Sequence, residues 1–149
     1  MRKEKIAMKN IQAQFQMLDN YVKEYSLKTS GKITENMDTK INGQIGFGIV
    51  RITTKEDKLI GEIELSNTLE IISKEKSLAQ IQIVMRGLFS GDAKLKKSDF
   101  EEMLKINGST TLSHLIRAYI HTNTAISGMP NIIVPMINFV QFFKESEIK

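Results

Sequence analysis

The chain has 149 residues and no cysteine, which excludes a disulfide framework and any chemistry that needs a thiolate. Hydrophobic residues make up 41% and charged residues 26%, so we expect residues 1–149 to form one globular domain. The net charge is +4, but arginine is scarce, tryptophan is absent and no strand interleaves basic with aromatic residues, which argues against direct nucleic-acid binding. No signal peptide and no run long enough for a membrane span is present, so we expect a cytoplasmic location without membrane insertion.

The first strand is expected to begin at Ile11, because apolar residues alternate with glutamines from there to Met17. The alternation continues to Leu27, and Asp19–Asn20 between its two halves predicts a bulge. A polar connection, Thr29–Lys40, comes next. Connections of this length between strands are more often functional than incidental, so this loop is a candidate binding segment.

Three more strands are predicted by period-two patterns and by the charged turns between them. The second begins at Ile41 and contains glycines, which allow another backbone to come close. The third spans Leu59–Ile71 and the fourth spans Leu78–Phe89, and the turns Lys55–Lys58 and Ser73–Lys76 join them as hairpins. Strands joined in this way indicate a four-stranded antiparallel sheet.

Helices are expected after the sheet, which gives an α+β fold. Ser98–Glu101 fits a capping box at the start of a short helix that ends at Asn107–Gly108. Apolar residues at three- and four-residue steps then predict a long helix, capped by a hydroxyl within Ser109–Thr111 and ended by Gly128. The apolar segment Met129–Phe139 is held extended by its two prolines, and a short amphipathic C-terminal helix follows.

No pattern of catalytic or metal-binding residues is present. His114 and His121 are seven residues apart on the long helix, almost two turns, so one helix cannot bring both to a single zinc ion. Ser113 and His114 are neighbours that point apart and do not form a nucleophile with its base. We therefore expect no enzyme, no metal and no cofactor.

Three stretches form a pattern whose order and spacing are more informative than any one of them. Tyr21–Lys28 is similar to the pattern Tyr-x-Lys-Asp-x-Ser-Phe-Glu, and Arg86–Ser90 is similar to a Gly-Ile-Phe strand end. The long helix ends in Gly-x-Pro at Gly128–Pro130, and an aliphatic run then leads to a proline and Asn138–Phe139. Together these stretches resemble the SecB-type export chaperones over the span Phe15–Phe143.

The resemblance implies an ATP-independent holdase: a four-stranded antiparallel sheet packed on helices, assembled as a dimer of dimers, with long grooves for unfolded or pre-export polypeptides. Apolar contacts along an extended client add by avidity, which gives affinity without sequence specificity. By this resemblance, the candidate peptide-binding residues are Met37, Ile41, Phe47, Phe89, Met129, Pro130, Phe139 and Phe142.

The chain departs from the family in charge, because SecB proteins are usually acidic. In the family, acidic residues of the first strand help to dock the motor SecA. Glu24 keeps one acidic position, but Lys28 reverses another, so we expect docking of SecA to be weakened. Pro135 also lies one place early relative to the family's Pro-x-Asn-Phe. Two alternatives are a chaperone dedicated to one partner, such as an antitoxin, and a non-chaperone oligomeric adaptor; an enzyme for a small ligand ranks third.

Overall fold

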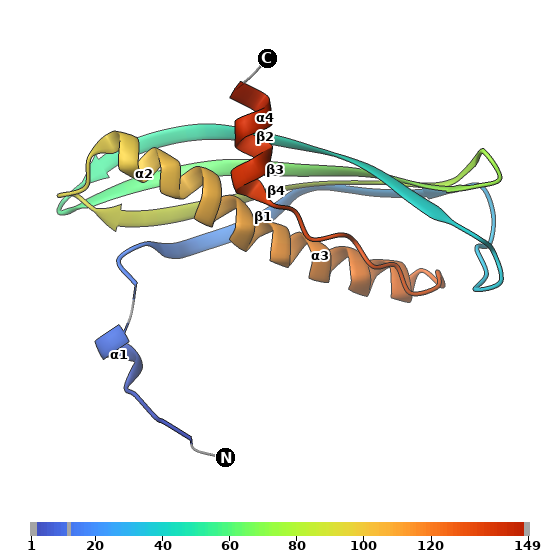
Figure 1. Ribbon diagram of the computed structural model, residues 1–149, viewed down its shortest axis with the longest axis horizontal. Helices are drawn as coiled ribbons and strands as arrows, with labels where there is room; N and C mark the ends of the chain where they lie inside the picture. Colours follow the sequence, from blue (N-terminus) through green and yellow to red (C-terminus); the bar gives the residue numbers. More distant parts are fainter. Residues whose placement is uncertain (1–2, 12, 148–149) are drawn as a thin grey trace.

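The computed structural model describes residues 3–11 and 13–147 and shows a four-stranded sheet with helices packed on one face (Figure 1). The strands are β1 (Gln16–Thr29), β2 (Lys40–Lys55), β3 (Lys58–Ser73) and β4 (Lys76–Asp92). They are antiparallel and lie in the order β1-β4-β3-β2, so β1 and β2 are the edges of the sheet. The predicted α+β fold with a four-stranded antiparallel sheet is confirmed.

The helical segments are α1 (Met8–Ile11), α2 (Lys97–Met103), the π-helical segment η1 (Leu104–Gly108), α3 (Ser109–Ile126) and α4 (Phe139–Glu147). All of them except α1 form a layer on one face of the sheet (Figure 1). α2, η1 and α3 follow one another without a break and run along the length of the sheet, whereas α4 crosses it and α1 stands apart from it (Figure 1).

The helix end predicted at Asn107–Gly108 is wrong, because Gly108 keeps helical angles of φ −62° and ψ −48°. Its missing side chain has a packing role instead: a Cβ atom there would lie 2.8 Å from Ile63 Cδ1 on β3. Gly61 has the same role on the sheet, since its Cβ would lie 2.5 Å from Leu104 Cδ1. These glycines let the helix and the sheet approach each other closely.

The caps predicted at the helix starts are not formed. α2 begins after Lys96, and no side chain caps it, so Ser98–Glu101 is not a capping box. Thr110 and Thr111 lie inside the continuous helix, and their hydroxyls donate to carbonyl oxygens one turn earlier. Because the helix is continuous here, the backbone N–H groups at the start of α3 donate to carbonyl oxygens of the preceding turn, and no N–H group is left for a hydroxyl cap.

The helix end predicted at Gly128 is confirmed. Gly128 has a φ of 79°, in the left-handed region that favours glycine. Its N–H donates to the Ala125 carbonyl oxygen at 3.1 Å, and the Met129 N–H donates to the Thr124 carbonyl oxygen at 3.0 Å. These two bonds form a Schellman motif, which turns the chain back along α3.

The predicted start of the first strand at Ile11 is wrong. Ile11 ends the short helix α1, and pairing with β4 begins only at Gln16. Phe15 leaves the ladder because its ring packs under the helix layer: it stacks on Phe89 at 5.2 Å and lies 6.1 Å from Phe100. Gln12, part of the predicted alternation, lies outside the described residues.

Both edge strands carry bulges. In β1 the pairing register shifts between Met17 and Asp19 and again between Val22 and Glu24. The first shift lies beside the predicted bulge, at Leu18 instead of Asp19–Asn20. β2 has one shift, between Ile49 and Arg51. Bulges disturb the row of free backbone groups along an edge and so reduce uncontrolled strand pairing.

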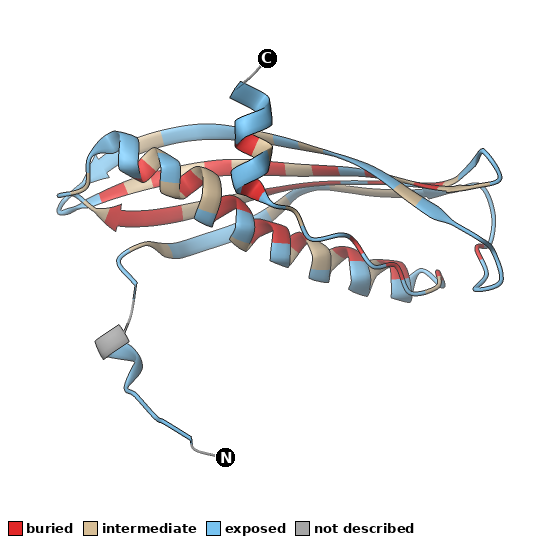
Figure 2. Ribbon diagram, in the orientation of Figure 1, coloured by how far each residue is buried: buried red, intermediate tan, exposed pale blue. Residues whose placement is uncertain are grey.

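The core lies between the sheet and the continuous helix. Alternate residues of β3 and β4 and the inner side of α3 are buried (Figure 2). At the β1 edge, Tyr25 contacts Tyr119 of α3 edge to face, with ring centroids 5.0 Å apart. Burial, and secondarily the Tyr119 phenol, raises the pKa of Tyr25. This aromatic contact packs the edge strand β1 against α3.

Candidate functional site

The helix-facing side of β2 carries a row of partly exposed apolar residues that we call the β2 strip: Ile41, Ile45 and Phe47. Their partners on β3 are Ile71, Asn67 and Leu65, all of which are buried. The strip itself is only half-buried, because α3 packs on β3 and β4 while β2 lies at the edge. It therefore offers apolar surface beside an edge strand.

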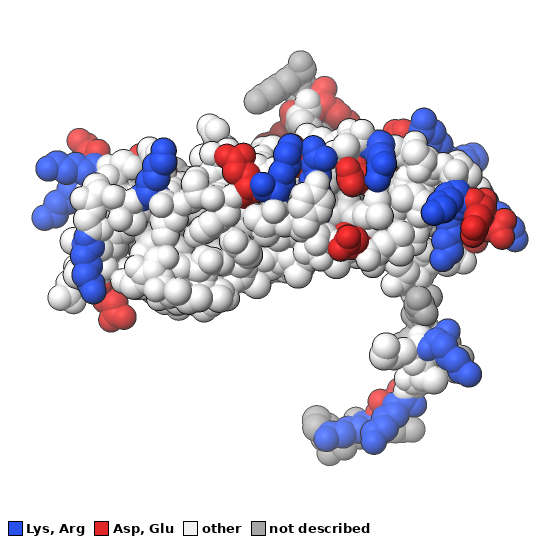
Figure 3. Space-filling model, turned by 180° about the vertical axis from the view of Figure 1, so that it is seen from behind, with Lys and Arg blue, Asp and Glu red and all other residues white. Residues whose placement is uncertain are grey.

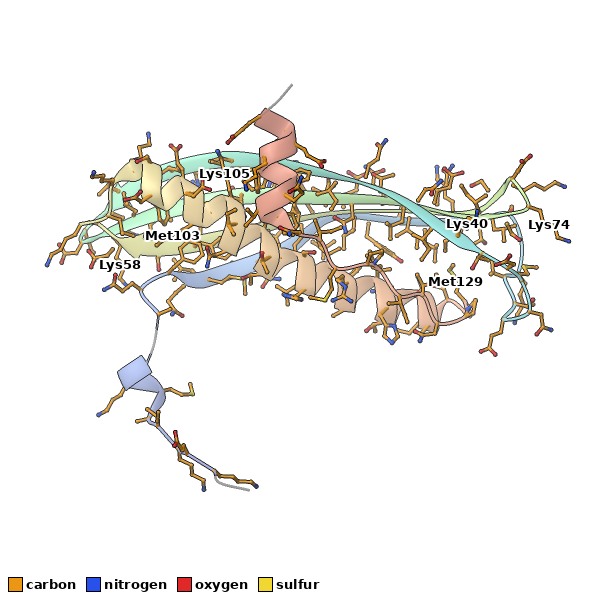
Figure 4. All side chains as sticks on the ribbon, viewed as in Figure 1. Lys40, Lys58, Lys74, Met103, Lys105 and Met129 are labelled. Atoms are coloured by element: carbon orange, nitrogen blue, oxygen red, sulfur yellow. The ribbon has the colours of Figure 1, made fainter. Side chains whose placement is uncertain are left out.

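One end of the β2 strip meets the phenylalanine cluster, formed by Phe139, Phe142 and Phe143 of α4. Phe47 contacts Phe143 edge to face, with ring centroids 4.9 Å apart, and Phe142 meets Phe143 at 5.0 Å. Lys105 is labelled beside α4 in Figure 4. Its ammonium lies 5.9 Å from the Phe143 ring centroid, over the face of the ring. Phe143 is buried, whereas Phe47 and Phe142 keep exposed edges.

A pocket of about 380 Å³ joins two segments that are far apart in the sequence. It is lined by 32–36 of the loop between β1 and β2 and by Gly128–Pro130 after α3. Ile33 and Met129, at its base, are 4% and 9% exposed. Met37, farther along the loop, is 40% exposed. The loop and the Gly-x-Pro turn thus form one local surface.

The chain then returns beside α3 as an extended segment, which we call the strap (129–138). Its side chains alternate: Ile132 and Val134 are buried, while Ile133 and Met136 are each 70% exposed. Arg117 of α3 donates from Nε to the Val134 carbonyl oxygen at 2.8 Å and holds the strap in place. The sequence analysis did not select Ile133, because the unbroken Ile-Ile-Val run does not distinguish exposed from buried positions.

The structure separates the predicted peptide-binding residues into two groups. Phe89, Phe139 and Met129 are 1%, 3% and 9% exposed and pack in the core, so they offer little surface. The others are exposed or half-buried: Met37, Ile41, Phe47, Pro130 and Phe142. Phe47 and Phe142 both contact Phe143. Met37 lies in the long loop, and Pro130 lies beside that loop at the C-terminal end of α3. Peptide binding at these residues stays a prediction.

Glu24 and Lys28 are both exposed and lie on the face that the helices leave uncovered. Lys28 pairs with Gln80 and Glu24 pairs with Val84, while the alternate β4 residues Ile81 and Ile83 point to the core. No register shift lies between Glu24 and Lys28, so the two side chains share one face, as their spacing predicts.

The uncovered face also holds a chain of ion pairs that crosses all four strands. Lys23 of β1 and Arg86 of β4 contact Glu64 of β3 at 3.2 Å and 3.0 Å. Arg86 reaches Glu62 at 3.6 Å, and Glu62 reaches Arg51 of β2 at 3.8 Å. The hydrogen bond from Arg86 lowers the pKa of Glu64. These pairs depend on strand register, which the sequence alone did not provide.

Within 3–11 and 13–147, no three His, Asp or Glu side chains are close enough to hold a metal ion. His114 and His121 are exposed and stand on the outer side of α3. In the same part of the chain, no helix is both long and apolar enough to cross a membrane.

The fold is similar to that of a solved SecB-like chaperone. That protein is Rv1957 of Mycobacterium tuberculosis, in complex with a ChAD peptide from the Rv1956 HigA1 antitoxin. The two chains superpose with a TM-score of 0.67 at 14% identity, covering 85% of this chain and 93% of that chain. A protein of unknown function from Streptococcus agalactiae superposes with a TM-score of 0.50 at 16% identity, covering 81% and 96%.

The family model described as preprotein translocase subunit SecB matches residues 8–149. The chain therefore belongs to the SecB family, and the fold and the family together support a chaperone. Comparison with curated proteins gives no match.

Proposed function

We propose that this chain is an ATP-independent holdase that binds unfolded or pre-export polypeptides. The observation that carries the proposal is the β2 strip, a half-buried apolar row on an edge strand that runs to the phenylalanine cluster. A folded chain that keeps this much apolar surface accessible gains stability by covering it with another chain. Membership of the SecB family supports the same conclusion.

In the proposed mechanism, an extended client lies along β2. Its apolar side chains pack on Ile41, Ile45 and Phe47, and its backbone pairs with the free groups of the edge strand. Backbone pairing is independent of sequence, and many weak apolar contacts add by avidity. The client is protected from aggregation while it is bound, and release needs only competition, without nucleotide hydrolysis.

We also propose assembly into a dimer of dimers. The outer side of the helix layer keeps several large apolar side chains exposed, among them Ile126 at 80% and Ile133 and Met136 at 70% each. Cover by further subunits would bury them. Light scattering at micromolar concentration should give a mass above the 16.9 kDa of one chain, and a monomer at all concentrations would contradict this assembly.

The proposed holdase is tested by titrating a labelled, permanently unfolded client at low and physiological salt. Binding should survive the change in salt, because the contacts are mainly apolar. Phe142→Asp should weaken binding while circular dichroism stays unchanged, and Gln141→Asp, its exposed neighbour on α4, is the matched control. If the wild type does not bind the client at either salt concentration, the holdase proposal is wrong and the alternative of a non-chaperone oligomeric adaptor is retained.

A second candidate function is a chaperone dedicated to one antitoxin. It is favoured by the structural similarity to Rv1957, which was solved with an antitoxin peptide. A dedicated chaperone should bind its own client much more tightly than unrelated unfolded chains. If the gene neighbourhood encodes an antitoxin, competition between a peptide of that antitoxin and a general unfolded client distinguishes the two functions, because equal affinities would favour the general holdase.

Docking of SecA belongs to the general export function. If Lys28 repels a basic surface of this motor, Lys28→Glu should strengthen binding at low salt, where exposed charges are least screened. Lys76→Glu, an exposed change at the start of β4, controls for net charge. Tight SecA binding that Lys28→Glu leaves unaltered would contradict the role of this charge.

A further inference from the structure

The basic charge of this protein is concentrated in its first residues. Residues 1–11 contain four basic residues and one acidic residue, so they contribute +3 of the net charge of +4: Arg2, Lys3, Lys5 and Lys9 are basic, and Glu4 is acidic. The remaining chain is therefore close to neutral. Among the described residues, the ion pairs all join side chains of the sheet, and the lysines of the first segment are exposed.

We call residues 3–11 the N-terminal arm, because this segment leaves the sheet and points away from both layers (Figure 1). From the opposite side, its basic atoms stand clear of the body (Figure 3). Every residue in 3–9 is exposed. The arm can therefore approach an extended surface without hindrance from the folded body.

The arm is apolar as well as basic. Ile6 is 60% exposed and Met8 is 81% exposed, so neither side chain is used in the core. The two apolar residues alternate with lysines along the arm: Ile6 follows Lys5, and Met8 precedes Lys9. A segment that offers lysines and bare apolar side chains together is suited to an interface that is anionic outside and apolar beneath.

We infer that the N-terminal arm binds the anionic surface of a phospholipid membrane, with its lysines at the headgroups and Ile6 and Met8 at the acyl boundary. A nucleic acid would use the lysines but would leave the apolar side chains in water, and the arm offers no aromatic ring for stacking on bases. The inference goes beyond the holdase activity, because it concerns where the chain is held and not what it binds.

One arm provides a weak attachment, and several arms provide a useful one. Each basic residue near an anionic leaflet raises partitioning by about fivefold, so the net charge of two on residues 3–11 raises it by about 25-fold. In an oligomer, arms on different subunits bind one membrane together and multiply this effect. Attachment should be reversible and should weaken as salt screens the lysines.

The test is cosedimentation of the full chain with vesicles that contain phosphatidylglycerol and phosphatidylcholine, and with vesicles of phosphatidylcholine alone. We expect binding only to the anionic vesicles. Lys3→Glu with Lys5→Glu and Lys9→Glu should lower partitioning about a hundredfold or more. The same change in net charge at the hairpin ends, Lys55→Glu with Lys74→Glu and Lys76→Glu, should leave most of the binding in place.

A second variant separates lipid from other polyanions. Ile6→Ser with Met8→Ser keeps the charge and should weaken vesicle binding several-fold, without changing any affinity for single-stranded RNA. No binding of the wild type to anionic vesicles at low salt would overturn the inference. Equal losses in the arm and hairpin-end variants would also overturn it, as would preferential binding to RNA, which would assign the arm to nucleic acid. None of these results depends on client binding.

Discussion

Replacing Gly61 with alanine should destabilise the fold, because the added methyl group has no space. Its Cβ would lie 2.5 Å and 2.9 Å from the two terminal carbons of Leu104 and 3.0 Å from Phe100 Cε2. Leu104 and Phe100 are both 0% exposed, so neither can move into solvent. Overpacking of this kind costs about 1–3 kcal/mol, against a gain of about 0.4–1 kcal/mol from the lower entropy of the unfolded chain. We expect a net loss of about 1–2 kcal/mol.

The measurement is urea unfolding followed by circular dichroism. Gly48→Ala on β2 is the matched control: nothing lies within 4 Å of its Cβ position, so its stability should be unchanged or slightly higher. Leu104→Ala alone should cost about 2–5 kcal/mol, and the double variant should be more stable than the sum of the two losses predicts, because the smaller side chain makes room for the methyl group. Equal stability of Gly61→Ala and Gly48→Ala would refute the claim that this contact limits the packing.

Three further predictions concern turns and charges. Lys74 and Glu75 have φ values of 50° and 65°, so Asn-Gly at these positions should stabilise the fold by about 1–2 kcal/mol in thermal unfolding; a lower midpoint would contradict this. Gly128→Ala, at φ 79°, should cost about 1 kcal/mol in the same assay, and a neutral result would show that the helix end relaxes. The hydrogen bond from Arg86 lowers the pKa of Glu64 in the folded protein. The ionised Glu64 therefore stabilises the fold fully at any pH above the pKa that it has in the unfolded chain, and this contribution is lost as the pH falls through its pKa in the folded protein. Glu64→Gln should therefore cost less than about 1 kcal/mol near neutral pH and should flatten the acid side of the stability curve, and an unchanged acid slope would rule out this carboxylate as a contributor.

The strands were predictable because each has its own local pattern. β3 and β4 alternate buried with exposed or half-buried positions, and their hairpin turns are charged, which is visible in the sequence. The start of β1 was not predictable, because Ile11–Met17 has the same alternation as a strand. What ends the pairing is a tertiary contact, the stacking of Phe15 on Phe89, and such contacts override local preference.

The candidate site was predicted only in part, for a similar reason. An apolar residue at a strand end or beside a proline has the same sequence signature whether it faces the core or solvent. Phe47 and Phe89 illustrate this: both occupy strands, but Phe47 is half-buried on an edge and Phe89 is 1% exposed at the centre of the packing. Strand order decides between them, and strand order is a property of the whole sheet.

The contact between Tyr25 and Tyr119 gives the protein an optical signal of its own. The chain has three tyrosines and no tryptophan, so two of its three main fluorophores meet at the junction of β1 with α3. Release of this edge strand would expose both phenols to water, change the near-ultraviolet ellipticity and lower the raised pKa of Tyr25 toward its ordinary value. Because the chain lacks tryptophan, a tryptophan-bearing client can be excited selectively, so the client and the β1 edge can be followed separately in one sample.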